Sequence, residues 1–181
     1  MAVPREHHTA TLLADGRVLV VGGEDDDPDD LATVELWDPA TEAFEATGPM
    51  AHARTEHTLT ALPDGRALVM GGGCCDSDEA AELWDPATGR FGPTGPVPDR
   101  SGATATLLPG ARVLLVGGYG NGGYPTEAWL WDPTSGEVTP AGSLLQGRTH
   151  HTATRLLDGG VLIVGGEGGE YSLDSAELWR L

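Results

Sequence analysis

The sequence repeats itself four times, and this internal repeat limits the possible folds more than any other feature. An arginine recurs at intervals of 49, 46 and 48 residues, as Arg5, Arg54, Arg100 and Arg148. A pair of glycines begins seventeen residues after each arginine, as Gly22-Gly23, Gly71-Gly72, Gly117-Gly118 and Gly165-Gly166. A tryptophan recurs at intervals of 47, 47 and 48 residues, as Trp37, Trp84, Trp131 and Trp179. Because these three markers recur in the same order and at nearly the same spacing, the chain is built from four copies of one structural unit.

Each copy begins with two short strands joined by a tight turn. The first strand of the first copy is predicted over residues 8–13, where apolar and polar side chains alternate. Asp15-Gly16 follows it and favours a hairpin, because glycine adopts the positive φ of a tight turn. The third copy has Pro109-Gly110 at this place, so its turn should differ. The second strand, Val18 to Val21, is apolar on both faces, which predicts that both faces are covered.

A third and a fourth strand complete the unit. The third strand ends at the repeated tryptophan and is followed by an Asp-Pro turn, such as Asp38-Pro39. The first copy has Glu42 where the next two have Gly89 and Gly136, so we expect strain of about 1 kcal/mol at Glu42. Short fourth strands are predicted over 44–47, 91–94 and 138–140. Four antiparallel strands in roughly 47 residues are typical of one blade of a β-propeller.

The repeat resembles that of the kelch family, in the bacterial form related to the central domain of galactose oxidase. The residues that carry the resemblance in the first copy are Arg5, His8 to Leu13, Asp15 to Gly23 and Glu35 to Pro39. The resemblance implies an all-β, kelch-type propeller of four repeats, at residues 5–50, 51–96, 97–144 and 145–181 of a single domain, 1–181. Each blade should have four antiparallel strands except the last, which lacks its outer strand. The repeated glycines and tryptophans are then structural residues of the blades.

Three arrangements of these blades are compatible with the repeat. Propellers of this family usually have roughly six or seven blades, so the chain is interpreted first as a partial propeller, a fragment of a larger one. A second interpretation is a homodimer in which two copies complete a ring of about eight blades. A third is a small ring of four blades that closes alone.

The charge of the chain disfavours several classes of partner. It has 28 acidic residues against 10 basic ones, for a formal net charge of −18. Such a surface repels nucleic acids and anionic membranes, so neither is expected as a partner. No apolar run approaches the roughly 20 residues that cross a bilayer, and residues 1–8 do not resemble a signal peptide. The simplest compartment is therefore the cytoplasm, or the exterior if the chain belongs to a longer precursor.

The repeated arginines are candidates for ligand or partner binding. In a propeller, the segment before the first strand and the loop between the second and third strands open on the same face. Arg5, Arg54, Arg100 and Arg148 should form a partial ring there, beside variable loops at 24–30, 73–79, 119–126 and 167–174. The arginines could contact a ligand, or they could form ion pairs with the acidic loops and so order the face.

Histidines at one repeat position form a second candidate set, His8, His57 and His151, with Ala103 in the third copy. No further ligand motif supports a metal site, so we interpret these histidines as repeat residues that bond neighbouring backbone. His7 and His150 precede two of them and are expected at the surface.

Three other motifs invite a functional interpretation that the sequence does not support. Asp25 to Asp30 is acidic but lacks the spacing of a known calcium loop, and Cys74-Cys75 has no partner cysteine elsewhere. The glycine-rich run 117–123 follows a strand, but no helix follows it to bind a phosphate. All three are therefore interpreted as loops.

No catalytic centre, metal or cofactor is predicted. The copper site of galactose oxidase is built from two tyrosines, two histidines and a cysteine, and Tyr119, Tyr124 and Tyr171 match no motif of that site. These tyrosines stay as candidates for ligand contact.

The leading hypothesis is a non-catalytic interaction module that presents loops on one face to a protein or carbohydrate partner. The alternatives are a galactose oxidase-like or other sugar-modifying enzyme, and a fragment of a larger propeller protein.

Overall fold

The computed structural model describes residues 1–25, 31–72 and 80–180, and within these residues the chain is all-β. Fifteen strands form four antiparallel sheets there, and the single helix in this part of the chain is the 3-10 turn Pro109–Ala111. The first sheet contains β1 (Thr9–Leu12), β2 (Val18–Val21), β3 (Val34–Asp38) and β4 (Ala43–Ala46). The second contains β5 (Thr58–Ala61), β6 (Ala67–Met70), β7 (Ala80–Asp85) and β8 (Arg90–Pro96). The third contains β9 (Thr104–Leu107), β10 (Val113–Val116), β11 (Glu127–Trp131) and β12 (Val138–Ser143), and the fourth contains β13 (Thr152–Arg155), β14 (Val161–Val164) and β15 (Ala176–Trp179).

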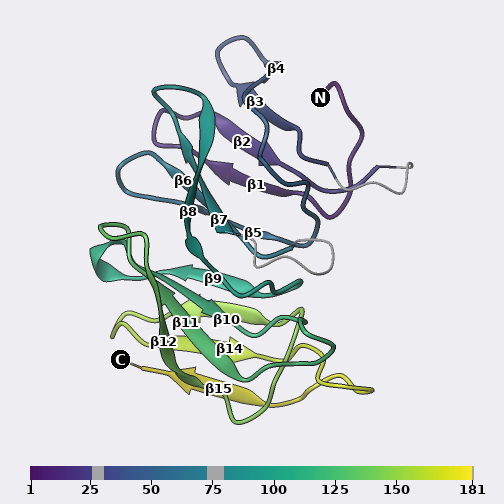
Figure 1. Cartoon of the computed structure of the whole chain (residues 1–181), viewed down its shortest axis with the longest axis vertical. Coiled ribbons are helices and arrows are strands. Elements are labelled where there is room, and N and C mark those ends of the chain that lie inside the picture. The colour runs from purple at the N-terminus through teal and green to yellow at the C-terminus, as the bar shows by residue number, and fades with distance from the viewer. Residues whose placement is uncertain (26–30, 73–79, 181) are drawn as a thin grey trace.

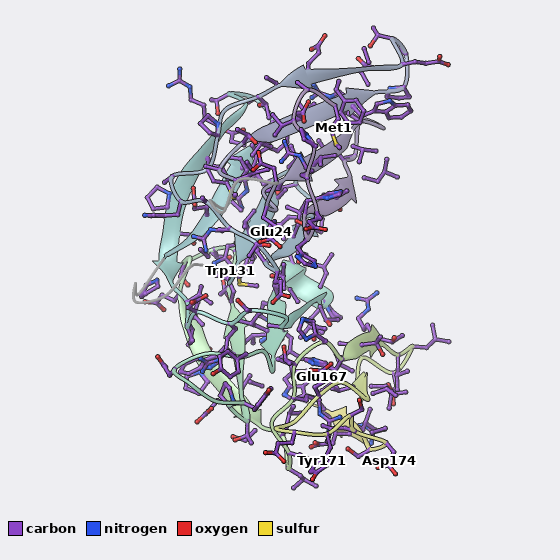
Figure 2. All side chains as sticks on the ribbon, turned by 90° about the vertical axis from the view of Figure 1, so that its right-hand side faces the viewer. Met1, Glu24, Trp131, Glu167, Tyr171 and Asp174 are labelled. Atoms are coloured by element: carbon purple, nitrogen blue, oxygen red, sulfur yellow. The ribbon has the colours of Figure 1, made fainter. Side chains whose placement is uncertain are left out.

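The four sheets are the blades of a β-propeller. They follow one another in chain order, with the first blade at one end and the fourth at the other (Figure 1). The first strands of successive blades, β1, β5, β9 and β13, pack side by side, and the row bends into an arc (Figure 2). The prediction of an all-β propeller of four blades, the last with three strands, is confirmed. No helix in the described ranges is long and apolar enough to cross a membrane.

The hydrophobic core lies between the blades and not within any one of them. Leu19 and Val21 of β2 pack with Val69 of β6 and Trp84 of β7 in the first of three clusters. The second and third blades enclose a corresponding cluster, and so do the third and fourth. In the second and third blades the apolar second strands have both faces covered, because each of these blades contacts a neighbour on either side, as the sequence pattern predicts.

Glycine pairs end the second strands because neighbouring backbones approach closely at this point. Gly22 has a φ of 58°, and a Cβ placed on it would lie 2.6 Å from the carbonyl oxygen of Arg54 in the next blade. Gly23 donates its N–H to the same carbonyl at 2.8 Å. A side chain here would separate the two blades, so the repeated glycines hold the blades in contact.

Local departures from the repeat follow their sequence differences. The turn at Pro109-Gly110 is a 3-10 turn in which Ala111 has a φ of 61°, so the expected difference in the third copy is confirmed. Glu42 has a φ of 54°, which confirms the strained position predicted for it. The fourth strands β8 and β12 extend further than predicted, and a register shift accommodates the extra residues in each.

Candidate functional site

Each repeated arginine points back into its own blade. Arg5 donates from Nη1 to the carbonyl oxygen of Gly22 at 2.7 Å and from Nη2 to Oε2 of Glu35 at 3.0 Å. Arg54 and Arg148 make the corresponding bonds to the first glycine of their pairs, at 2.9 Å and 2.8 Å. All these guanidinium groups are buried. Among the described residues, they connect the glycine pair after the second strand to the glutamate of the third strand.

The glutamates that receive these arginines also hold the chain that enters the blade. Glu35 accepts the N–H of Ala2 at 2.7 Å, and Glu82 accepts the N–H of Ala51 at 2.7 Å. Glu177 accepts the N–H of Leu145 at 2.6 Å and binds Arg148 at 2.7 Å. Burial opposes ionisation of Glu177, but the bonds from Leu145 and Arg148 outweigh it and lower the pKa of the carboxyl group. Each Arg–Glu pair therefore fixes the start of its blade.

The third blade lacks this pair, because Trp129 occupies the position of the glutamate. Arg100 is buried there and donates to the carbonyl oxygen of Asp99 at 3.0 Å. Burial lowers the pKa of Arg100, while the charges of Glu127 and Asp99 act in the opposite direction. Arg100 thus keeps its place in the blade with a different set of partners.

The repeated histidines join neighbouring blades. Nε2 of His57 lies 2.6 Å from Oγ1 of Thr9, and Nε2 of His151 lies 2.8 Å from Oγ1 of Thr104. The partner of Nε2 is thus a hydroxyl group on the preceding blade in both cases. Burial, reinforced by the charge of the nearby arginine, lowers the pKa of both histidines to about 4. His8, at the same position of the first blade, is exposed.

The residue before each repeated histidine adopts a left-handed conformation. His7, Glu56 and His150 have φ values of 50°, 50° and 51°, and Gly102 has 65° at the corresponding position of the third blade. Their backbones form a chain of hydrogen bonds across the blades, from Glu56 N–H to the His7 carbonyl at 3.2 Å, from Gly102 to Glu56 at 3.1 Å, and from His150 to Gly102 at 2.9 Å. These four residues therefore form a continuous rim along one end of the innermost strands.

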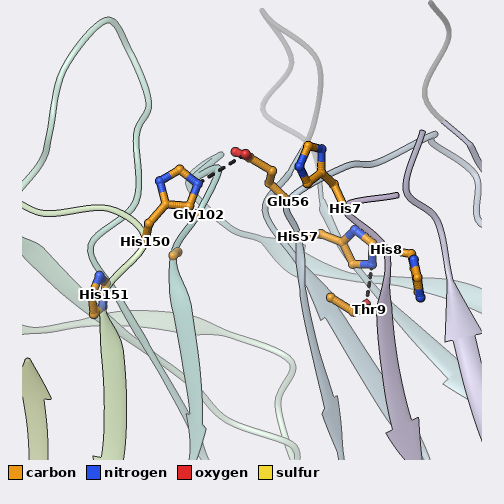
Figure 3. A pocket seen from close by; sticks show the side chains of 9 residues that line it. His7, His8, Thr9, Glu56, His57, Gly102, His150 and His151 are labelled. Atoms are coloured by element: carbon orange, nitrogen blue, oxygen red, sulfur yellow. Dashed lines mark hydrogen bonds and ion pairs between the residues drawn. The ribbon is translucent and has the colours of Figure 1, made fainter. Parts of the chain in front are cut away.

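The rim encloses an open cavity of about 390 Å³. The lining residues are His7, His8, Thr9, Glu56, His57, Gly102, Ala103, His150 and His151. Nε2 of His150 lies 3.2 Å from Oε1 of Glu56, and the two side chains meet over Gly102 (Figure 3). His57 lies deeper, against Thr9. The cavity thus has neutral imidazole groups at its base and ionisable groups at its mouth.

Three carboxylates act on His7 at the edge of the cavity, and of these Glu56 lines it. The hydrogen bond from His7 to Glu24, 2.6 Å long, raises the pKa of His7, and the charges of Glu24, Glu6 and Glu56 act in the same direction. Since these carboxylates gather beside one exposed imidazole, the local field favours cations.

The candidate tyrosines lie in the loops and do not line this cavity. The rings of Tyr119 and Tyr124 meet edge to face with centroids 5.3 Å apart, and the Tyr124 hydroxyl donates to the carbonyl of Gly169 at 3.5 Å. Tyr171 is exposed at the fourth-blade end of the arc (Figure 2).

Within the described ranges, no three His, Cys, Asp or Glu side chains are grouped so as to hold a metal ion. Residues 26–30 of the acidic loop and Cys74-Cys75 lie outside those ranges.

Sequence reasoning placed His57 and His151 in the candidate set but did not select Glu56. An alignment of the four copies would have found it. The position before each repeated histidine differs among the copies, whereas the positions around it repeat; the residues there are His7, Glu56, Gly102 and His150. The hydrogen bond between Glu56 and His150 joins residues 94 positions apart, so only the curvature of the blades brings them together.

A comparison of this chain with models of protein families and with curated proteins finds no match.

Proposed function

We propose that this chain is a non-catalytic, kelch-type interaction module that binds a basic segment of a partner protein at the rim cavity. The kelch assignment rests on the repeated Arg, Gly-Gly and Trp positions in the phase described above. The proposed binding mode rests on the cavity and its charge.

The observation that carries the proposal is the left-handed conformation of three non-glycine residues at the rim. Gly102 shows that glycine fits this position, yet His7, Glu56 and His150 retain side chains there. A non-glycine residue in this region costs about 1 kcal/mol, and such strain is concentrated at functional sites. The retained side chains surround the cavity, which is where a ligand would meet them.

The chemistry of the cavity favours binding over catalysis. The Thr9 hydroxyl and His57 are close enough for a nucleophile and its base, but an imidazole with a pKa of about 4 is a weak base. Arg54 is the charged group beside His57, in place of the carboxylate that orients a catalytic histidine. The same Thr–His bond recurs in the fourth blade, as expected of a structural contact.

A cationic protein segment is favoured over a neutral glycan because Glu56 lines the cavity and Glu6 and Glu24 lie near its edge, beside His7. Glu56 lies at the centre of the rim and is partly exposed, so an arginine or lysine side chain can reach its carboxylate. The formal net charge of −18 would attract such a segment at long range.

The test is fluorescence anisotropy with a labelled peptide of alternating arginine and glycine at about 0.15 M salt. Loss of one charge-assisted contact in Glu56→Gln should weaken binding roughly tenfold. Glu45→Gln is the matched control, since it removes one equal charge from an exposed residue of β4. Its affinity should stay within about twofold of that of the native chain. Equal losses in both variants would mean that the peptide senses only the overall charge, and would overturn the proposed site.

A further inference from the structure

The two ends of the arc expose surfaces that are buried everywhere else in the molecule. We call the side of a blade that contacts the preceding blade its leading face, and the side that contacts the following blade its trailing face. The trailing face of the fourth blade carries Leu156, Leu162, Val164, Ala176 and Leu178. The leading face of the first blade carries Ala10, Leu12, Val18, Trp37 and Phe44.

The trailing face of the fourth blade is apolar like the faces at the internal junctions, but its residues are exposed. Val164 is 42% exposed, whereas the residues at the same repeat position, Val21, Met70 and Val116, are exposed by 0%, 0% and 1%. Leu178 is 45% exposed, whereas Leu36 and Leu130 are each 8% exposed. Because the residues at these positions are apolar in every blade, the fourth blade has kept a surface suited to covering by another blade.

The leading face of the first blade shows the same contrast. Phe44 is exposed, although its counterpart Phe91 packs into the cluster between the first and second blades. Trp37 is only half-buried, whereas Trp84 and Trp131 are fully buried. The two end faces are therefore the two halves of one interface that the chain forms three times internally.

Polar groups at the two ends match as well. Two internal junctions contain a bond from a repeated histidine to the threonine of the preceding blade, Thr9 to His57 and Thr104 to His151. The corresponding groups at the ends of the arc are Thr152 on the fourth blade and His8 on the first, and both are exposed.

A glycine on the fourth blade points to the same conclusion. A Cβ on Gly22, Gly71 or Gly117 would clash with the arginine carbonyl of the next blade. Gly165, at the same repeat position, has no such neighbour, and the nearest atom to a Cβ there is the carbonyl oxygen of Leu173 at 3.6 Å. Its positive φ of 67° is retained, so the backbone is shaped for a following blade.

We propose that a second copy of this chain places the leading face of its first blade on the trailing face of this fourth blade. The reciprocal contact joins the other two ends, and the pair forms a closed ring of about eight blades. A second copy is the fitting partner because this chain itself carries both halves of the interface. The proposal is independent of the basic ligand proposed above, since it concerns the end faces and not the rim cavity.

The first test is the mass of the native chain by light scattering after gel filtration, which should be about twice that of one chain. Val164→Arg should reduce it to that of one chain, since the arginine would lie inside both junctions. Leu157→Arg is the matched control: Leu157 is fully exposed in the turn between β13 and β14, so this variant should stay dimeric. A monomeric native chain, or a dimer that survives Val164→Arg, would overturn the proposal.

A mixing experiment separates a broken interface from a misfolded variant. Phe44→Arg alters the leading face as Val164→Arg alters the trailing face, so each variant alone should be monomeric. When the two are mixed, one junction of the heterodimer contains only native faces, and the mass of a dimer should return. Circular dichroism of each variant checks its fold. Two well-folded variants that stay monomeric on mixing would exclude the head-to-tail arrangement, and a mass that grows without limit in the native chain would exclude ring closure.

Discussion

Histidine serves two different purposes in this protein, and the surroundings of each residue decide which. His57 and His151 are buried between blades, where their imidazole groups are held neutral against a threonine hydroxyl. His7 and His150 lie one residue earlier in the repeat, at the exposed rim, where each contacts a carboxylate. Burial lowers the pKa in the first case, and the hydrogen bond to Glu24 raises the pKa of His7 in the second.

The buried histidines predict a loss of stability in mild acid. The pKa of His57 is about 4 in the folded chain, below the value of about 6.5 in the unfolded chain, so the unfolded chain binds protons first as the pH falls. The contribution of His57 is complete above pH 6.5 and is lost between 6.5 and about 4. At about pH 5 the loss should be on the order of 2 kcal/mol.

Urea unfolding at about pH 7.5 and about pH 5 measures this effect. In His57→Gln the difference between the two pH values should shrink by about 2 kcal/mol, because glutamine does not titrate there. Thr9→Val removes the hydroxyl partner and keeps the burial, which is the main cause of the shift, so it should retain the native pH dependence. An unchanged pH dependence in His57→Gln would show that His57 is not the titrating group.

The blade is stabilised by contacts that repeat with the sequence. The arginine joins the glycine pair to the third strand, and the glutamate of that strand holds the chain that enters the blade. The third blade replaces the glutamate with Trp129, yet its four strands pair in the same order as those of the first two blades. The strand order therefore does not depend on the Arg–Glu pair, which fixes how the first, second and fourth blades begin.

One hairpin of the first blade is strained by its sequence. Glu42 has a φ of 54° at the position of Gly89 and Gly136, whose φ values are 65° and 71°. Glu42→Gly should therefore raise the free energy of unfolding by about 1 kcal/mol, as measured by urea denaturation. Glu42→Ala keeps the strained backbone while it removes the carboxylate, so it should give little change. An equal gain in both variants would assign the effect to charge.

The whole molecule combines a strong negative charge with two apolar end faces. Two copies of a chain with a formal charge of −18 repel one another, while the end faces favour their association. Salt screens the repulsion, since the Debye length falls from about 30 Å at 0.01 M to about 8 Å at 0.15 M.

Association should therefore strengthen as salt is added. Sedimentation velocity at these two salt concentrations should show a dimer dissociation constant at least several-fold lower at the higher one. Binding of the basic peptide to the rim should weaken over the same range, because that contact is attractive. If salt shifts the dissociation constants of the dimer and of the peptide complex in the same direction, the net charge does not oppose the first and favour the second.

The local geometry of each blade follows from the repeat pattern. Its period, the Asp-Gly turns, the doubly apolar second strands and the glycine pairs each specify local geometry, and the interfaces repeat because the pattern repeats. Even the strain at Glu42 follows from comparing one copy with the next.

Contacts between residues far apart in the chain set where the charged groups point, and these contacts form only when the blades pack together. The arginines point inward because the carbonyl of the glycine pair and the strand-three glutamate, which are distant in the chain, lie together in the folded blade. The Glu56–His150 contact exists because the blades bend into an arc, and no local pattern encodes that curvature. Val21 and Val164 have the same residue type and repeat position, and the packing of the blades decides that the first is buried and the second exposed.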